Sequence, residues 1–418
     1  MAQLGNDCFA AGQGLMTAAD ALAFIDTRIA PVAEVESLPL AQARGRILSD
    51  DLVASGNVPP HDNAAVDGFA FRSGDIKDGA PTRFRIAGRA AAGHPATAPA
   101  SPDEAIRIFT GAVMPAELDT IAMQEDCTSD DSEVTIPPGL RPGANCRQTG
   151  EDITSGAIIL RAGQILRPQD IGLAAAAGNA LLSVRERLRV AVFSTGDEIV
   201  EPGAPLPAGA IHDANRYTLI ALLEGMGCAV RDLGILPDQS AAIATGLTSA
   251  ATDSDLVVTS GGVSVGEEDH VRGAVEKLGR LHFWRLAIRP GRPLALGQIG
   301  NTAFVGIPGN PVAVMVTFLM FVRPLVHRLA GAAATPPRRF PVAAKFKCGK
   351  KQGRREWVRA RLDGTQGDLP AARRFERDGA GILSSMVESD GLIELAEDIT
   401  HVSPGDVLPF IPYSELLS

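Results

Sequence analysis

The sequence of 418 residues predicts an α/β protein whose central domain is flanked by regions rich in β-strands. From Leu188 onward, strand-like runs alternate with helical ones, which is typical of a doubly wound, mostly parallel sheet. Before this region, residues 83–136 contain short strand-like runs between glycine and proline turns, and they predict a small inserted β domain. After it, alternating runs beyond the linker at residues 331–337 predict a small β barrel or sandwich.

Composition and charge exclude several classes of protein. With 45% hydrophobic and 21% charged residues, the chain has the composition of a soluble globular protein. Its length allows two to four domains of roughly 150 residues each. The net charge of −10 argues against general nucleic-acid binding. The five cysteines are scattered and form no C-x-x-C pair, which predicts neither a disulfide framework nor a zinc site and favours a reducing cytoplasm.

Neither a secretion signal nor a membrane span is expected. The N-terminus lacks a basic region followed by an apolar core. The longest apolar helix, residues 312–322, is expected to end at Arg323 and Pro324, well short of the ~20 apolar residues that a span needs. We therefore expect no membrane partner.

The first part of the chain is expected to combine short helices with strands. Apolar spacing predicts helices over residues 17–28 and 39–48, and an alanine-rich helix over residues 168–177. Before this last helix, apolar runs at residues 158–160 and 165–166 bracket a glycine turn and predict a hairpin.

The central region predicts four parallel strands joined by helices. The strands are expected at residues 189–193, 230–236, 255–259 and 282–288. The helix after the third strand is expected to end at Gly279 as its C-cap. Beyond the fourth strand, residues 293–298 and 302–305 predict a hairpin at the sheet edge. A buried helix follows, with Asn310 suited to cap it and Pro311 to its first turn.

A glycine-rich loop follows the third strand, at the edge where ligands of such sheets bind. In Ser260, Gly261 and Gly262, backbone N–H groups can approach an anion without interference from a Cβ. Ser264 adds a hydroxyl, and the acids at residues 267–269 suit a phosphate that carries a divalent metal. A plain tight turn is the alternative interpretation; we favour an anion-binding loop.

A second polar loop follows the first strand at the same edge of the sheet. It consists of Ser194, Thr195, Gly196, Asp197 and Glu198. The two acids are candidates for metal handling or acid/base chemistry. Adjacent acids in a loop are more often simply solvated, which is the alternative.

Positive charge is concentrated in two places. Arg285, Arg289 and Arg292 lie in or just after the fourth predicted strand, and the first two would share a face because four residues are two strand periods. Between Lys345 and Arg361 there are eight Lys or Arg residues and a single acid. Each set is either a solvated surface or a wall that attracts anions.

Several motifs occur together in an order that is typical of one family. They lie at residues 62–70, 147–153, 194–198, 260–266, 289–293 and 308–311. In these motifs the chain resembles the bacterial molybdopterin molybdenumtransferases, the MoeA family, which is related to the gephyrin E domain. The resemblance covers essentially the whole chain from Ala18 onward.

The resemblance implies a protomer of four parts and a head-to-tail homodimer. The parts are an elongated N-terminal domain, an inserted β domain, an α/β molybdopterin-binding domain and a C-terminal β barrel, over residues 14–54 with 151–186, 55–150, 187–332 and 333–418, respectively. The active cleft would lie between the β insertion of one protomer and the α/β and C-terminal domains of the other.

The resemblance also implies an activity. Members of this family insert molybdenum from molybdate into adenylylated molybdopterin with Mg²⁺, and release AMP. The implied partners are a molybdopterin adenylyltransferase upstream and cofactor-maturation proteins or molybdoenzymes downstream, in the cytoplasm. The alternatives are a non-catalytic molybdopterin carrier or scaffold, and a molybdopterin adenylyltransferase; the long N-terminal part and the C-terminal barrel argue against the second.

The resemblance assigns roles to individual residues. The implied catalytic residues are Asp67, Asp152, Glu198, Asp238 and Asp269. The implied metal ligands are Asp197, Glu198 and Asp269. The implied cofactor-binding residues are Thr110, Ser194, Thr195, Gly196, Ser260, Gly261, Gly262, Ser264, Arg285, Arg289, Pro308 and Arg359. By their position alone, Asp238 and Asp269 could each be a helix N-cap instead.

Two departures from the family pattern concern anion binding. Arg285 and Arg289 stand where the family has lysines; arginine keeps the charge and offers a planar fork to an oxyanion. Ala380 stands where the family has a serine beside the arginine that Arg359 matches. We expect Ser384 or a backbone N–H to take the place of that serine.

Overall fold

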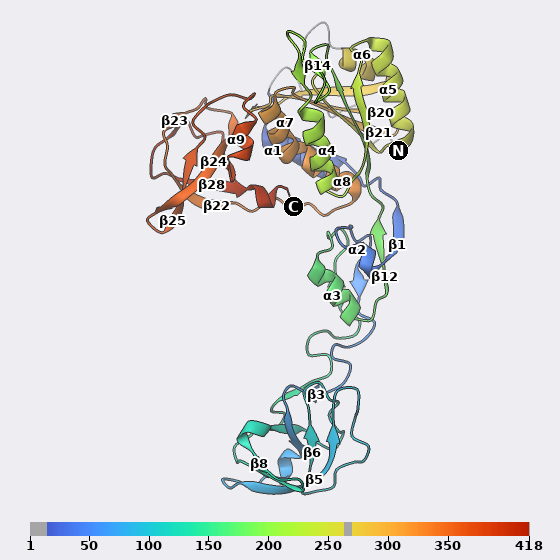
Figure 1. Ribbon diagram of the computed structural model, residues 1–418, viewed down its shortest axis with the longest axis vertical. Coiled ribbons are helices and arrows are strands. Elements are labelled where there is room, and N and C mark those ends of the chain that lie inside the picture. The colour runs from blue at the N-terminus through green and yellow to red at the C-terminus, as the bar shows by residue number, and fades with distance from the viewer. Residues whose placement is uncertain (1–14, 263–269, 418) are drawn as a thin grey trace.

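The computed structural model describes residues 15–262 and 270–417 (Figure 1). The molecule is elongated, and Figure 1 shows a small β domain at one end of its long axis and the α/β domain at the other. A narrow stem joins these two domains, and the C-terminal barrel projects sideways from the α/β domain. The predicted fold class is confirmed.

The N-terminal part of the chain starts in the α/β domain and then runs down the stem. Helix α1 (Ala18–Arg28) is capped by the side chain of Thr17 and packs against helix α8 (Arg323–Ala330) in the main hydrophobic core. The stem contains the antiparallel pair β1 (Val35–Pro39) and β12 (Leu181–Arg185). This pair carries the chain toward the β domain and back.

The helices of the stem are short. α2 (Leu40–Ala43) is a single turn, much shorter than the helix predicted over residues 39–48, because Gly45 adopts a left-handed φ of +74° and ends it. α3 (Pro168–Ala176) forms as predicted, and Gly178 follows it with a φ of +83°.

The hairpin predicted at residues 158–166 is wrong. β11 (Ile158–Leu160) pairs instead with β2 (Leu52–Val53), and Ile165 bridges Ile47. Apolar side chains around these segments form one hydrophobic cluster. Pairing with the distant segment therefore buries apolar surface that an isolated hairpin would leave exposed.

The inserted β domain is built on a six-stranded sheet in the order β7-β4-β6-β5-β9-β8. The strands are β4 (Gly68–Phe71), β5 (Thr82–Ala90), β6 (Glu104–Ile108), β7 (Thr120–Met123), β8 (Thr128–Ser129) and β9 (Glu133–Ile136). Side chains of successive residues point to opposite faces of this sheet, so Ala70 packs in one hydrophobic cluster and Phe71 in another. A separate antiparallel pair consists of β3 (Asn63–Ala64) and β10 (Cys146–Arg147).

The α/β domain contains the predicted doubly wound sheet, in the order β16-β13-β17-β21-β20-β18. Its strands are β13 (Arg189–Thr195), β16 (Ala229–Leu236), β17 (Leu256–Ser260), β18 (Gly279–Arg285), β20 (Pro293–Ile299) and β21 (Thr302–Ile307). Helices α5 (Ser240–Asp253) and α6 (His270–Leu278) pack on one face, and α4 (Asn215–Gly225) and α1 on the other. A short pair, β14 (Ile199–Val200) and β15 (Ile211–His212), lies beside the sheet.

The strand predicted at residues 282–288 is split between two sheets. The fourth parallel strand is β21, whereas β18 forms the sheet edge, antiparallel to β20. The end of the predicted run belongs to β19 (Ile288–Arg289), which pairs with the barrel. Gly279 begins β18 rather than capping α6, and a Cβ there would lie 1.9 Å from the carbonyl oxygen of Gln298.

One long buried helical run follows β21. It consists of α7 (Pro311–Thr317), a π-helical turn (Phe318–Val322) and α8. The predicted end at Arg323 and Pro324 is wrong, because the run continues to Ala330; the π turn changes the hydrogen-bond pattern ahead of the proline and lets it be accommodated. The run of 20 residues is long and apolar enough to cross a membrane, but 78% of its apolar window is buried inside the protein. This burial is typical of a core helix.

The C-terminal domain is a closed barrel, with strand order β19-β24-β25-β22-β28-β26 and an additional β24–β26 pairing that closes it. Its other strands are β22 (Phe340–Ala344), β24 (Arg355–Gln366), β25 (Leu369–Arg374), β26 (Gly391–Leu395) and β28 (Val407–Pro412). The domain also contains the pair β23 (Cys348–Gly349) and β27 (His401–Val402), and helix α9 (Ser384–Val387).

Replacing Gly68 by alanine should destabilise the β insertion. A Cβ at Gly68 would lie 1.9 Å from the carbonyl oxygen of Ala122 on the neighbouring strand β7, so the two strands would have to separate. We expect a loss of ~2–3 kcal/mol, measured by thermal unfolding of the full chain. Gly74→Ala is the matched control, because nothing lies within 4 Å of a Cβ there. Equal unfolding midpoints for the two variants would contradict this strand packing.

Candidate active site

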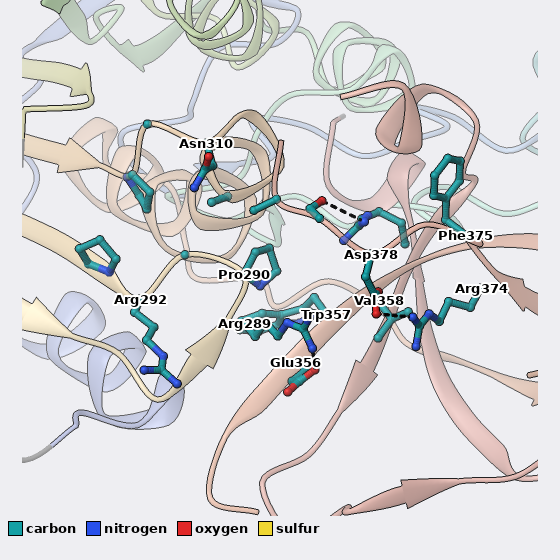
Figure 2. A pocket seen from close by; sticks show the side chains of 18 of the residues that line it. Arg289, Pro290, Arg292, Asn310, Glu356, Trp357, Val358, Arg374, Phe375 and Asp378 are labelled. Atoms are coloured by element: carbon teal, nitrogen blue, oxygen red, sulfur yellow. Dashed lines mark hydrogen bonds and ion pairs between the residues drawn. The ribbon is translucent and has the colours of Figure 1, made fainter. Parts of the chain in front are cut away.

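A cavity of about 520 Å³ lies between the α/β domain and the barrel (Figure 2). The α/β domain contributes the turns that follow β17 and β21 and the segment at residues 289–293. The barrel contributes part of β24 and the segment at residues 374–380. The cavity thus stands beyond the carboxyl ends of two neighbouring parallel strands, the edge at which such sheets bind ligands.

The turn after β17 can be built only with glycine. Gly261 and Gly262 have left-handed φ values of +82° and +61°, and a Cβ on Gly262 would lie 2.7 Å from a side chain of α6. The Gly261 N–H donates to the carbonyl oxygen of Ile307 at 3.0 Å, so β21 fixes the position of the turn. Glycine here brings the backbone to the cavity wall.

The turn before α7 forms an adjoining wall. Asn310 stands at the predicted N-cap position, but its side chain makes no capping hydrogen bond and instead helps to line the cavity. The Asn215 amide donates to the carbonyl oxygen of Gly309 at 2.6 Å. The Val312 N–H donates to the carbonyl oxygen of Ala380 at 2.9 Å, which ties a barrel loop to the start of α7.

Arg359 of β24 brings an uncompensated positive charge to the cavity. Its Nε donates to the Ser385 hydroxyl at 3.0 Å, and its Nη2 donates to the carbonyl oxygen of Gly379 at 3.3 Å. Both partners are neutral, and no carboxylate among the described residues pairs with this guanidinium. Burial lowers the pKa of Arg359, against the opposing effect of Asp378. A positive group held without a counter-charge suits an oxyanion.

Of the three other arginines that line the cavity, Arg292 is exposed, whereas Arg289 and Arg374 lie beside carboxylates. Figure 2 shows Arg289 beside Glu356 and Arg374 beside Asp378. Nη1 of Arg289 lies 3.5 Å from the carboxylate of Glu356, which also accepts a hydrogen bond from Arg354 at 3.0 Å. Nη2 of Arg374 lies 2.6 Å from the carboxylate of Asp378. Because Glu356 is shared, Arg289 is only partly neutralised.

The structure brings several predicted binding residues into the cavity lining. They are Gly261, Gly262, Arg289, Pro308 and Arg359. Ala380 lines it as well. The expectation for Ser384 is wrong: Ser384 is exposed, and the next residue, Ser385, contacts Arg359 because it is the one that the turn of α9 directs inward.

The spacing predicted that Arg285 and Arg289 share one face of a strand, and this prediction is wrong. Arg285 ends β18 and is exposed outside the cavity lining. The chain then turns, with the N–H of Leu286 donating to the carbonyl oxygen of Arg292 at 2.8 Å. Arg289 consequently belongs to the sheet of the barrel.

The loop after β13 borders this cavity without lining it. Ser194 and Thr195 are buried at the end of the strand, and Ser194 is in register with the buried Ser260 of β17. The Thr195 hydroxyl donates to the carboxylate of Asp238 at 3.2 Å. Ser194, Thr195 and Ser260, at the ends of two neighbouring strands, therefore lie at one edge of the sheet. Asp238, which follows the end of strand β16, lies at the same edge.

The acidic end of this loop is exposed. Gly196 has a φ of +142°, and a Cβ on it would lie 2.6 Å from Oε2 of Glu198, so the carboxylate folds back over the glycine. Asp197 and Glu198 are both exposed. Among residues 15–262 and 270–417, no group of three or more His, Cys, Asp or Glu residues could hold a metal ion. Two carboxylates nonetheless fit Mg²⁺, which keeps several waters and uses substrate phosphates as ligands.

A buried arginine supports the segment that follows. Arg216 of α4 is 2% exposed and pairs with Asp213 at 2.9 Å, with Glu201 at 2.5 Å, and with Asp232. This network attaches the β14–β15 segment to α4. Sequence reasoning missed it, although the spacing of three between Asp213 and Arg216 was a usable signal.

Sequence reasoning also missed most of the barrel side of the cavity. The basic run at residues 345–361 was its one signal, and the run is divided in the structure. Arg354 and Arg355 pair with acids, whereas Arg359 faces the cavity. Asp378 and Arg374 lie in sequence that carries no recognisable motif.

Three predicted residues lie far from this cavity within one protomer. Asp67 and Thr110 belong to the β insertion, whose strands lie at the opposite end of the molecule (Figure 1), and Asp152 directly precedes Ile153, which bridges Val58. The Asp67 carboxylate accepts the backbone N–H of Thr110 at 2.8 Å and its hydroxyl at 2.7 Å, which lowers the pKa of Asp67. Asp62 and Thr149 repeat this arrangement at 2.7 and 2.6 Å. The predicted Ser264 and Asp269 lie outside the described residues.

The fold and the cavity together define a class of protein. A doubly wound α/β domain presents glycine turns to a cavity that a barrel closes with arginines. This arrangement is that of a protein that binds an oxyanion substrate at a domain junction.

The chain belongs to the MoeA family. Residues 16–178 match the MoeA N-terminal region (domain I and II), residues 191–328 the probable molybdopterin binding domain, and residues 341–413 the MoeA C-terminal region (domain IV). The resemblance inferred from the motifs is confirmed.

Relatives with established names span nearly the whole chain. The chain is similar to the molybdopterin molybdenumtransferase of Haemophilus influenzae, with 37% identity over 92% of this chain and 95% of the relative. It is 34% identical to molybdopterin molybdenumtransferase 2 of Mycobacterium tuberculosis, over 89% of this chain and 93% of the relative. The crystal structure of the molybdopterin biosynthesis MoeA protein from Pyrococcus horikoshii OT3 has a TM-score of 0.84 at 28% identity, covering 96% of this chain and 100% of that one.

Thr110→Val should raise the pKa of Asp67. The change removes the hydroxyl donor and keeps the backbone N–H donor, so part of the stabilisation of the carboxylate is lost. The folded pKa of Asp67 lies below 3.8, so its contribution to stability is present above the unfolded pKa and is lost as pH falls through the folded pKa. In the variant the folded pKa lies closer to the unfolded one, so the contribution to stability is smaller and is lost completely at a higher pH. A ¹³C NMR titration of labelled aspartates measures the raised folded pKa.

Thr149→Val provides the matched control for this experiment. It should raise the pKa of Asp62, whose carboxylate is held in the same way, and leave Asp67 unchanged. An unchanged titration of Asp67 in Thr110→Val would contradict the role given to the hydroxyl.

Proposed function

We propose that this protein inserts molybdenum from molybdate into adenylylated molybdopterin and releases AMP. The relatives support the transferase class, since those that span the chain are named molybdopterin molybdenumtransferase. The observation that carries the proposal is the cavity itself, where Arg359 and Arg289 face the glycine turn at Gly261 and Gly262 across a domain junction.

Molybdate is a tetrahedral dianion, and its recognition requires positive groups and N–H donors in one place. Arg359 supplies a guanidinium that its neutral partners, Ser385 and Gly379, orient without neutralising it. Arg289 supplies a second, partly neutralised guanidinium. We propose that these two arginines bind the oxyanion, and that the backbone after β17 binds substrate oxygens beside it.

The adenylylated substrate contains a pyrophosphate whose P–O–P bridge must break for AMP to leave. We propose that Asp197 and Glu198 hold Mg²⁺ together with these phosphates, because both carboxylates are exposed at the tip of β13. When bound, the cation would neutralise phosphate charge and polarise the bridge. Asp238 accepts a hydrogen bond from Thr195 at the same edge of the sheet. We propose that it helps to orient the phosphates and the cation.

A head-to-tail homodimer would complete this site. Asp67 and Thr110 form a fixed carboxylate–hydroxyl pair on the β insertion, at the opposite end of the protomer from the cavity (Figure 1). They can join the cavity only from a second copy of the chain. We propose that each active site combines the β insertion of one protomer with the α/β domain and barrel of its partner.

The chemistry of the substrate also suggests the surroundings of the enzyme. A molybdopterin adenylyltransferase would supply the adenylylated substrate, and cofactor-maturation proteins or molybdoenzymes would receive the product. The dithiolene of molybdopterin requires a reducing compartment, and four cysteines of the described chain are free thiols. We therefore propose a cytoplasmic location.

The paired change Asp197→Asn with Glu198→Gln should abolish turnover and largely keep substrate binding. It removes two negative charges from the proposed metal-binding loop and leaves the arginine cavity intact. Release of AMP from adenylylated molybdopterin, with Mg²⁺ and molybdate, measures turnover, and calorimetry measures binding. Wild-type protein that binds this substrate as a folded dimer but releases no AMP would instead be a carrier, and the transferase proposal would fail.

Mixed dimers should recover activity if the site is shared between protomers. Asp67→Asn and Glu198→Gln homodimers each carry a defect in both sites, whereas a heterodimer of the two has one site in which both positions are wild type. Unfolding and refolding an equimolar mixture should restore about one quarter of the wild-type rate. Recovery that never exceeds the sum of the two parent activities would show that Asp67 and Glu198 act in the same protomer or not at all.

A further inference from the structure

A second cavity, of about 330 Å³, lies on the other side of the barrel junction. Helix α1, the helical run that ends in α8, the linker at residues 334–337 and strand β24 enclose it. Its walls are largely apolar and include Leu22, Ile25, Leu319 and Trp357. This volume is in the range of small-molecule sites.

Arg323 introduces an unpaired positive charge into this apolar cavity. The residue is 8% exposed and lines the cavity, and its Nε is buried without a hydrogen-bond partner. Among the described residues, no carboxylate forms an ion pair with it. Burial lowers the pKa of Arg323, which expresses the cost of removing the charge from water. Buried charges in proteins are normally paired, so the unpaired guanidinium of Arg323 indicates an anionic ligand that is not part of the chain.

The acid within the cavity lining does not supply that partner. The carboxylate of Glu394 lies 3.1 Å from Nη2 of Arg339 and 3.3 Å from Nη1 of Arg355, and it accepts the indole N–H of Trp357 at 3.3 Å. Two arginines and an indole therefore satisfy this carboxylate fully, and Arg323 is left out of the network.

The remaining acids nearby lie closer to other arginines than to Arg323. Glu415, the acid whose field acts on Arg323, accepts a hydrogen bond from Nε of Arg338 at 3.0 Å. Asp26 of α1 is exposed and lies 3.8 Å from Nε of Arg328, which is within ion-pair range but too far for a hydrogen bond. His327 contributes no charge near neutral pH, because burial, followed by repulsion from Arg323, lowers its pKa to about 4.

We propose that this second cavity binds an organic carboxylate with an apolar body, whose carboxylate pairs with the guanidinium of Arg323. The apolar walls would take the body of the ligand, and the charge would select an anion over a neutral compound of the same shape. The site is distinct from the cavity between the α/β domain and the barrel that Arg359 lines, although Trp357 lines both. The inference does not depend on the proposed transferase activity.

Octanoate and 1-octanol, which differ in charge but share an alkyl chain, test the proposal by calorimetry on the full-length protein. Wild type should bind octanoate about tenfold or more tightly than the alcohol, because only the carboxylate forms a charge-assisted pair with Arg323. Arg323→Met should weaken octanoate binding by a similar factor and leave the alcohol unchanged. Arg361→Met, at an exposed position outside this cavity, should bind octanoate as wild type does.

Three results would overturn the proposal: no octanoate binding by wild type, equal affinity for octanoate and 1-octanol, or full octanoate affinity in Arg323→Met. Thermal unfolding separates a folding defect from a binding defect. Methionine removes an uncompensated buried charge, so the variant without ligand should unfold at or above the wild-type temperature. If Arg323→Met does not fold, Arg323→Lys is the alternative variant, because it keeps a positive charge at the site and should retain the preference for octanoate over 1-octanol. A folded Arg323→Lys protein without this preference counts against the proposal.

Discussion

The parallel pairing of β19 with β24 is the contact on which the rest of the proposed site depends. After β18 the chain leaves the α/β sheet, and the N–H of Arg355 donates to the carbonyl oxygen of Ala287 at 2.9 Å. The pairing places Arg289 opposite Glu356, on the barrel strand that also carries Arg359. Without it, Arg289 and Arg359 would belong to separate domains, and the glycine turns of the sheet would face solvent.

Unpaired positive charge is the feature that distinguishes both cavities from ordinary surface. Arg359 and Arg323 are each largely buried, and each lacks a carboxylate among the described residues. Acids are present close by, but they pair with other arginines. Beside the first cavity, for example, Asp378 forms an ion pair with Arg374. A fold selected for stability alone would pair or remove such charges. Retaining them is the expected cost of binding anions.

The sequence predicted the fold well where the pattern was local. The alternation of strands and helices, the glycine turn at Gly261, and the start of the helix at Pro311 all depend on neighbouring residues. It failed where long-range pairing decided the outcome. Residues 282–288 form one strand-like run in the sequence, but the end of this run pairs with strand β24 of the barrel. Arg285 and Arg289 consequently belong to different sheets.

The same limit applies to the site. The family motifs identified the glycine turns, which lie in recognisable patterns, and the family resemblance identified Arg359. Ser385 and Asp378 carry no pattern, and only the closure of the barrel brings them to the cavity. The position of Asp67 at the far end of the protomer was likewise beyond any reading of spacing, since distance between domains is not encoded in local sequence.

A crystal soaked in molybdate and measured at the molybdenum absorption edge tests the central claim most directly. The account predicts an anomalous peak in the cavity between the two domains, with oxyanion oxygens about 3 Å from the guanidinium groups of Arg289 and Arg359. A fully occupied peak elsewhere on the protein, with this cavity empty, would contradict it.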